Sequence, residues 1–294
     1  MRTIDFHAHL GDIYGAPGAQ INLEDRSLHT VHPQKANFYE ALNYGNIYFG
    51  KLNYLFKPLI ISAARVSSKY GNLPNLFESM ASNRIDKAVI LALEPFVPSD
   101  SILEAGRKHK NLIPFCSVHP HDQNKKEKIG RYVKAGAKGL KLHPVVQNFN
   151  PDDPAVFELL EEIKPHHLPV LFHTGWGAIG HGSYGFIGHY KKLLDNFKDI
   201  IFIFAHIGFY EPAPFIELMS KHDNVFGDIS WQPAGIIKKA IDKLGAERLV
   251  YGSDWPFNRQ GTSLKLIEKV TAGNKNLMEK LLFKNAEKLL KLTA

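Results

Sequence analysis

The sequence predicts an α/β protein built as a TIM-type (β/α)8 barrel, and three observations support this fold class. About eight short runs rich in β-branched or aromatic residues recur along the chain, the number of strands that such a barrel needs. Segments with helical spacing separate them, which indicates parallel strands. Several runs are apolar almost throughout, as expected of strands covered on both faces. The runs are Thr3 to Phe6, Lys87 to Leu93, Leu112 to Val118, Gly139 to Leu142, Pro169 to Phe172, Ile200 to Ala205, Val225 to Ile229 and Arg248 to Tyr251.

The first connection is much longer than the others. About 80 residues separate the first run from the second, whereas such a connection normally holds one helix and two short loops. We therefore expect an insertion at about residues 11–72 within a single domain of residues 1–294. Its aromatic residues predict a pair of helices with their own small core, compatible with a lid over the substrate or a subunit interface, which leaves a homodimer open. These residues are Phe38, Tyr39, Tyr44, Tyr48, Phe49, Tyr54 and Phe56.

The later connections show helical periodicity. In the segment Asp152 to His166, apolar residues fall at i, i+3, i+4 and i+7, which predicts a helix with one buried face. After the last strand, Leu264 to Leu292 is rich in lysine and leucine and predicts two amphipathic helices that pack against the barrel.

Composition narrows the functional class. The 294 residues are 44% hydrophobic and 22% charged, as in a folded, enzyme-sized protein. The single cysteine, Cys116, excludes an internal disulfide and fits a reducing, cytoplasmic compartment. We expect no membrane partner, because no apolar run approaches the roughly 18 residues of a spanning helix. The net charge of +7 is scattered, so we expect no nucleic-acid partner.

Histidine and aspartate lie at the ends of several predicted strands. His7 and His9 are two residues apart and so point to one face of the first strand. His173, His206 and Asp254 each follow an apolar run. In a parallel barrel these ends share one rim, where catalytic residues gather. Imidazoles with one carboxylate suit zinc or another late first-row divalent ion.

These motifs resemble the amidohydrolase superfamily, in the branch that includes decarboxylases of the aminocarboxymuconate-semialdehyde type. The resemblance covers essentially the whole chain, and its motifs match in order. They are Asp5-Phe-His7-Ala-His9, Phe172-His173-Thr-Gly, Ala205-His206-Ile-Gly and Gly252-Ser-Asp254-Trp-Pro.

The resemblance implies a role for each of these positions. His7, His9, His173 and Asp254 look like the ligands of one divalent metal ion, which we expect to be zinc, with manganese or iron as alternatives. His206 looks like a catalytic group that polarises the substrate or helps to activate water. A divalent ion with an open coordination position lowers the pKa of a water to about 7. Asp254 is then the catalytic group that accepts the proton and delivers it to the leaving group.

The fourth strand leaves two interpretations open. Lys141 and His143 lie two apart and face the same side. Lys141 resembles the carboxylated lysine that bridges two metals in some members of the superfamily, but the alternative, an ion pair with Asp5 or Glu94, fits the single-metal branch better. His143 is a candidate substrate contact or a structural group.

Other candidates carry weaker signals. Arg259 and Arg65 are the candidates for binding a substrate carboxylate through two parallel hydrogen bonds. His119 and His121 end the third strand and either line the pocket or face solvent. The run Gly180 to Gly185 formally matches a dinucleotide-binding fingerprint but begins too far from its strand, which indicates a glycine-rich active-site loop instead.

Three functions are compatible with this site. The first is a metal-dependent hydrolase that attacks a small-molecule amide, lactone or ester with a metal-activated water. The second is a metal-dependent decarboxylase of an unsaturated or aromatic carboxylic acid, which should supply arginine for the carboxylate; the scarcity of arginine favours hydrolysis. The third, distant alternative is a TatD-like nuclease, but its mid-chain glutamate motif is replaced here by Gly139-Leu-Lys141-Leu-His143. A small molecule is therefore the expected substrate.

Overall fold

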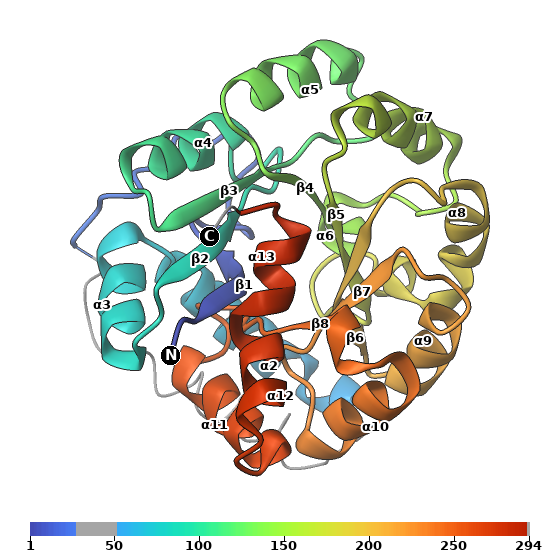
Figure 1. The fold of residues 1–294 in the computed structure, drawn as a ribbon. Coiled ribbons are helices and arrows are strands. Elements are labelled where there is room, and N and C mark those ends of the chain that lie inside the picture. Colours follow the sequence, from blue (N-terminus) through green and yellow to red (C-terminus); the bar gives the residue numbers. More distant parts are fainter. Residues whose placement is uncertain (28–51, 293–294) are drawn as a thin grey trace.

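A computed structural model describes residues 1–27 and 52–292, and within them eight parallel strands follow one another around a barrel (Figure 1). Each strand is hydrogen-bonded to the next in sequence order, so the predicted fold class is confirmed. The strands are β1 (Ile4–His9), β2 (Lys87–Leu91), β3 (Leu112–Cys116), β4 (Gly139–Leu142), β5 (Val170–Gly175), β6 (Phe202–Phe209), β7 (Val225–Asp228) and β8 (Leu249–Val250).

The chain that follows β8 closes the barrel against β1. The amide of Phe6 donates to the carbonyl of Tyr251 at 2.8 Å, and the amide of His9 donates to the carbonyl of Trp255 at 2.6 Å. Between them, the amide of Asp254 donates to the carbonyl of His7 at 2.8 Å. The first and last segments of the barrel are thereby joined at the rim where the predicted site lies.

Helices follow the strands, and most of them surround the barrel in a ring (Figure 1). They are α2 (Leu52–Lys69), α3 (Leu73–Asn83), α4 (Ser99–Lys108), α5 (Lys125–Lys134), α6 (Pro144–Gln147), α7 (Pro154–Ile163), α8 (Lys191–Asn196), α9 (Pro212–Met219), α10 (Ala234–Leu244), α11 (Gln260–Thr271), α12 (Lys275–Glu279) and α13 (Asn285–Leu289). Single turns add η1 (Lys164–His166), η2 (Gly182–Gly185), η3 (Ile187–His189), η4 (Ala246–Arg248) and the π-helical η5 (Lys280–Lys284). No helix among these is long and apolar enough to cross a membrane.

The predicted helix of the segment 152–166 shows how sequence sets local structure. Asp153 caps α7 by accepting a hydrogen bond from the amide of Ala155, and Pro154 occupies the first turn, where a missing N–H costs nothing. Val156, Leu159, Leu160 and Ile163 are fully buried on one face, as the spacing predicts, and the last three residues form η1.

Both faces of the strands are buried. Every residue of β3, β4 and β5 is buried, because the barrel interior covers one face and the helices cover the other. Outside the barrel, Phe172, Tyr190, Phe204 and Phe215 pack edge to face between β5, β6, α8 and α9. Cys116 is buried among the strands, as expected of a small core residue.

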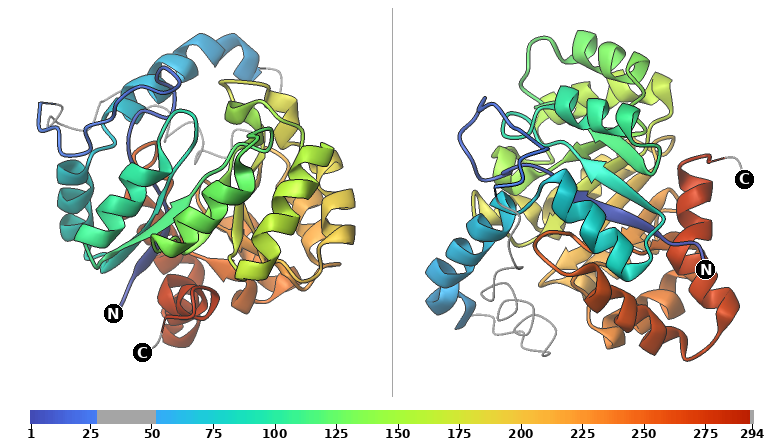
Figure 2. Two further views of the ribbon diagram at one scale, coloured as in Figure 1. Left: turned by 90° about the horizontal axis from the view of Figure 1, so that it is seen from above. Right: turned by 90° about the vertical axis from the view of Figure 1, so that its left-hand side faces the viewer.

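Helix α2 and the C-terminal helices α12 and α13 lie at opposite ends of the barrel (Figure 2). From the insertion, α2 lies at the end that carries the predicted site. At the other end, the carbonyl of Leu281 in η5 accepts a hydrogen bond from the amide of Tyr251. The predicted second C-terminal helix is realised as α12, η5 and α13 in succession. Most of the predicted aromatic core of the insertion, from Phe38 to Phe49, lies outside the described residues, and the single-domain organisation stays a prediction.

Candidate metal centre

The ends of β1 and β8 bring three of the predicted ligands together. His7 Nε2 lies 3.1 Å from His9 Nε2 and 3.2 Å from Asp254 Oδ1. His9 Nε2 lies 3.4 Å from the same carboxylate oxygen. All three side chains are buried. Two imidazole nitrogens and a carboxylate oxygen therefore converge on one point, although their residues lie at opposite ends of the chain.

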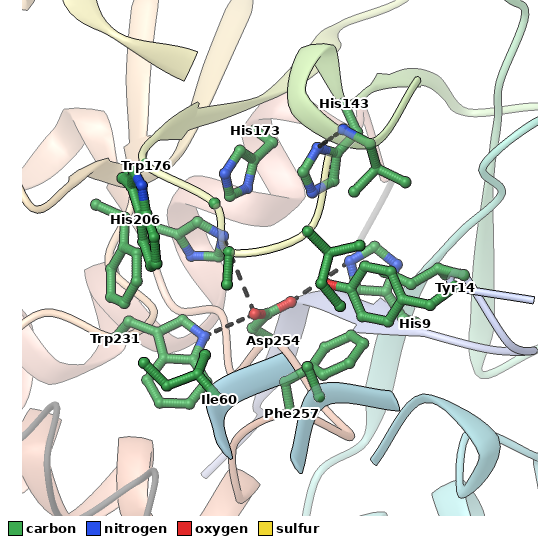
Figure 3. A pocket seen from close by; sticks show the side chains of 17 residues that line it. His9, Tyr14, Ile60, His143, His173, Trp176, His206, Trp231, Asp254 and Phe257 are labelled. Carbon is green, nitrogen blue, oxygen red and sulfur yellow. Dashed lines mark hydrogen bonds and ion pairs between the residues drawn. The ribbon is translucent and has the colours of Figure 1, made fainter. Parts of the chain in front are cut away.

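His206 and His173 face the same point from β6 and β5 (Figure 3). His206 Nε2 lies 4.0 Å from Asp254 Oδ2, and the nitrogen and oxygen atoms that His7, His206 and Asp254 offer all lie within 4.8 Å of one another. The rings of His173 and His206 meet edge to face with centroids 5.1 Å apart. His173 Nε2 is buried without a hydrogen-bond partner among the described residues.

Three site residues, one within β6 and two in the loops after β7 and β8, have an uncommon backbone conformation. His206, Trp231 and Asp254 have φ angles of 61°, 61° and 64°, in the left-handed region that non-glycine residues seldom occupy. Gln232 donates a hydrogen bond to the carbonyl of His206 and so joins the loop after β7 to β6. Strained residues of this kind cluster at functional sites, where the surrounding structure fixes them.

Trp231 is a site residue that the sequence did not indicate. Its indole N–H donates to Asp254 Oδ2 at 2.6 Å, and its ring lines the pocket. Asp254 thus directs one oxygen at His7 and His9 while Trp231 holds the other. A second missed residue is Asp228, the last residue of β7, whose carboxylate accepts a hydrogen bond from His7 Nδ1 at 2.6 Å. The position of Asp228 at the end of a predicted strand was the one sequence feature that could have indicated a role in the site.

Burial keeps the histidines uncharged. It lowers the pKa of His7, His173 and His206 well below the ordinary value, and the positive charge of Lys141 acts in the same direction. For His9, burial lowers the pKa while Asp254 opposes the change.

The donor set therefore fits a divalent metal ion. Neutral imidazoles are the form that binds metal. The unpartnered Nε2 of His173 belongs to a ring that lies beside His206 and lines the same pocket as Asp254. Three to four ligands of nitrogen and carboxylate oxygen are a set typical of zinc and related ions.

Lys141 does not form the predicted ion pair with Asp5 or Glu94. The Asp5 carboxylate accepts hydrogen bonds from Ser253 and Gln260, and Glu94 is bound by the Tyr132 hydroxyl and the Lys128 ammonium. Neighbouring hydroxyl, amide and surface lysine groups thus satisfy both acids.

The ammonium of Lys141 is left inside the barrel. Its Nζ is fully buried and has no hydrogen-bond partner among the described residues. Burial lowers the pKa of Lys141 to about 8, against the opposing charges of Asp254 and Asp228.

His143 lies at the pocket beside a predicted ligand. Its ring stacks on that of His173 with centroids 3.9 Å apart and planes within 9°. Its Nδ1 accepts a hydrogen bond from the amide of Val146 and caps α6. His143 thus has a structural partner on one side of its ring and lines the pocket.

The remaining candidates lie away from the centre. Arg259 is half-buried at the start of α11, Arg65 is exposed on α2, and neither is among the described residues that line the pocket. His119 binds the carbonyl of Gln147 and His121 pairs with Asp153. The loop after β5 does border the pocket, through residues 177–179.

The pocket over the centre is mainly apolar and aromatic (Figure 3). Besides the site residues, α2 contributes Ile60 and Ala64, so this helix covers one side of the pocket. Among the described residues that line it, none is lysine or arginine. The aromatic residues that line it are Tyr14, Trp176, Phe209, Trp231 and Phe257.

Solved structures share this fold over nearly the full length. An uncharacterised TIM-barrel protein from Bordetella bronchiseptica is 19% identical, with a TM-score of 0.70 and 99% of each chain covered. A probable 2-pyrone-4,6-dicarboxylic acid hydrolase from Acinetobacter baumannii, with citric acid bound, is 14% identical, with a TM-score of 0.64 and coverage of 99% and 100%. A 5-carboxyvanillate decarboxylase from Novosphingobium aromaticivorans, in complex with manganese and a nitrobenzoic acid, is 15% identical, with a TM-score of 0.69 and coverage of 99% and 96%.

Sequence comparison gives the family. A search of curated proteins finds no match. A family model described as Amidohydrolase matches residues 73–292, which include His173, His206 and Asp254. Because that match spans most of the chain, the protein belongs to the amidohydrolase family and is an enzyme of that family.

Proposed function

We propose that this protein is a metal-dependent hydrolase of a small-molecule amide, lactone or ester, and that it binds one divalent ion, zinc, through His7, His9, His173 and Asp254. The observation that carries the proposal is the convergence of buried, uncharged imidazoles on Asp254 at the C-terminal rim of the barrel. When bound, the ion lowers the pKa of a water to about 7 and so supplies a hydroxide nucleophile near neutral pH.

Asp254 is positioned to move the proton. Its carboxylate reaches the point where the histidines converge, and Trp231 fixes its orientation. It accepts a proton from the attacking water and passes it to the leaving nitrogen or oxygen, in the manner of a general acid–base catalyst. His206 lies on the other side of the carboxylate and assists in orienting that water.

The pocket favours an uncharged, flat substrate. Aromatic side chains form much of its lining, and such surfaces bind planar apolar groups by stacking and burial. The described lining residues offer no lysine or arginine for a carboxylate, a feature that favours hydrolysis over the runner-up reaction. The runner-up is decarboxylation of an unsaturated or aromatic acid, and the likeness to a decarboxylase that binds manganese supports it.

A paired screen tests the proposal. The zinc- and manganese-loaded protein is assayed against aryl esters, lactones and anilides for hydrolysis, and against aromatic and unsaturated carboxylic acids for release of CO2. We expect hydrolysis that needs metal and is lost in both His173→Ala and Asp254→Ala. Release of CO2 from an acid, without hydrolysis of any ester, lactone or amide, would instead establish the decarboxylase. Metal content that is unchanged in both variants would contradict the ligand set.

A further inference from the structure

Asp228 and Ser230 form a connection between two histidines of the site. Asp228 Oδ2 accepts one hydrogen bond from His7 Nδ1 at 2.6 Å and another from the Ser230 hydroxyl at 2.9 Å. The same hydroxyl oxygen lies 2.7 Å from His206 Nδ1. Asp228, Ser230 and His7 are at most 1% exposed. A chain of hydrogen bonds therefore runs from β1 through the end of β7 to β6.

Counting hydrogens fixes the direction of every bond in this chain when Asp228 is ionised. Burial raises the pKa of Asp228 to about 7, so above that pH its carboxylate only accepts, and His7 Nδ1 then carries a hydrogen. A serine hydroxyl has one hydrogen, and Ser230 donates it to Asp228. The Ser230 oxygen must then accept from His206, so His206 Nδ1 also carries a hydrogen. Both neutral rings consequently keep a free lone pair on Nε2, the atom that faces Asp254 in each case.

We propose that Asp228 is the positioning residue that sets the tautomers of both His7 and His206, directly for the first and through Ser230 for the second. For His7, the Nε2 lone pair is what a metal ligand requires. For His206, this inference rests on the proposed function: its Nε2 faces the pocket as an acceptor. It can therefore orient and receive a hydrogen bond from the attacking water, and it does not polarise a substrate carbonyl as a neutral donor.

Replacing Asp228 by asparagine should reverse both tautomers. Asp228 Oδ1 accepts from the amide of Ser230 at 2.8 Å, so in Asp228→Asn the amide oxygen stays at that position and the NH2 group takes the place of Oδ2. The NH2 group donates to His7 Nδ1, which moves the hydrogen of that ring to Nε2. The Ser230 hydroxyl, no longer able to donate to residue 228, donates to His206 Nδ1 with the same effect.

Nitrogen-15 NMR of the histidine rings reads the tautomers directly. The signals of His7 and His206 are assigned by their disappearance in His7→Ala and His206→Ala. In the metal-free wild-type protein at pH 9, where Asp228 is ionised, we expect both rings to carry hydrogen on Nδ1. Asp228→Asn should move both hydrogens to Nε2, whereas Ser230→Ala should change His206 alone. Ser230→Thr, which keeps the hydroxyl, should restore the wild-type signal of His206.

Zinc binding gives an independent measurement. With Zn²⁺ alone as the probe, we expect Asp228→Asn to weaken affinity about 10- to 100-fold, the usual effect of losing such a partner, and Ser230→Ala to leave it within about twofold. Ser99→Ala is the matched control: this buried hydroxyl bonds Ser117 at the end of β3, and its loss should change neither the two ring signals nor zinc affinity.

Clear results would overturn the inference. Finding the hydrogen on Nε2 of either ring in the wild-type protein at pH 9 overturns it, even if Asp228→Asn fails to fold. So does a change in the His7 signal in Ser230→Ala, or equal zinc affinity in Asp228→Asn and wild type. These measurements need no substrate. The expected tautomers in a protein that hydrolyses none of the screened compounds would uphold the positioning of both rings and refute the proposed reaction alone.

Discussion

At the scale of single residues, the Trp231 indole controls how Asp254 is presented. Its N–H donates to Asp254 Oδ2 at 2.6 Å, and hydrogen bonds to charged groups contribute about 1.5–3 kcal/mol. Trp231→Phe keeps an aromatic ring in the pocket but removes this donor. We expect kcat to fall about 10- to 100-fold while metal content stays at the wild-type value. Trp176→Phe, which leaves the Asp254 contact intact, is the control, and an equal loss of kcat in both variants would refute this role.

The Cys116 thiol should be unreactive in the native protein. Burial raises the pKa of Cys116 to about 12, so at pH 8 only about one thiol in ten thousand is the reactive thiolate. A colourimetric thiol reagent at pH 8 should therefore label almost no native protein and one thiol per chain in denaturant. Rapid labelling without denaturant would show that the thiol is accessible.

Single residues also show which part of the site the sequence could predict. The sequence places five polar side chains at or near the ends of apolar strands, and a parallel barrel brings such strand ends to one rim. Hydrophobic periodicity and short motifs are therefore enough to predict that these side chains lie close together. They are His7, His9, His173, His206 and Asp254. Asp228 and Trp231 have no such motif. Asp228 matters because it contacts a histidine nitrogen, and Trp231 because its indole N–H contacts the Asp254 carboxylate. Both contacts depend on the conformation of the loops, which hydrophobic periodicity does not predict.

At the scale of elements, β5 and β6 approach closely at Gly175. This residue has a φ of 88°, and a Cβ built there would lie 2.1 Å from backbone atoms of Phe209. Gly175→Ala should therefore lower the free energy of unfolding by at least about 2 kcal/mol, because neither the dihedral angle nor the contact can be kept. Urea denaturation measures this as a lower midpoint.

A glycine in an open helix is the matched control. A Cβ added at Gly130 in α5 would meet no described atom within 4 Å outside its own helix and its chain neighbours. Gly130→Ala should therefore raise the free energy of unfolding by about 0.5–1 kcal/mol. Destabilisation of similar size in both variants would mean that the close approach at Gly175 is not the cause.

The strands and the Asp152–His166 helix were predictable because their apolar residues repeat with the period of the element. The ends were less predictable. β6 continues to Phe209, beyond the predicted end at Ala205, and β8 is only two residues long. A strand ends where its backbone stops forming hydrogen bonds with the neighbouring strands. β8 ends early because the amide of Tyr251 donates to the carbonyl of Leu281 in η5 and not to a strand.

At the scale of the whole molecule, the pairing of Lys141 was the clearest wrong expectation. A buried lysine was expected to meet a buried acid, and both candidate acids are indeed buried. In the structure, Ser253 and Gln260 donate hydrogen bonds to Asp5. Tyr132 and Lys128 donate to Glu94. The sequence does not show that these residues, and not Lys141, bind the two acids. The hydrogen-bond partner of each buried acid depends on distances across the closed barrel, between residues up to 255 positions apart in the chain.

Barrel closure also predicts how metal affects stability. Of the candidate ligands, His7 and His9 come from the first strand, His173 from β5 and Asp254 from the chain after the last strand. An ion held between them therefore binds the folded barrel and not the unfolded chain. At a hundredfold excess of zinc over its Kd, the gain is about 2.7 kcal/mol, which raises the Tm by about 5 °C in a protein of this size. A chelator should reverse the shift. In the double variant His7→Ala/His9→Ala, zinc should leave the Tm unchanged, whereas Arg65→Ala, on the exposed face of α2, should retain the full shift. A zinc-dependent rise in Tm that persists in the double variant would place the ion elsewhere in the molecule.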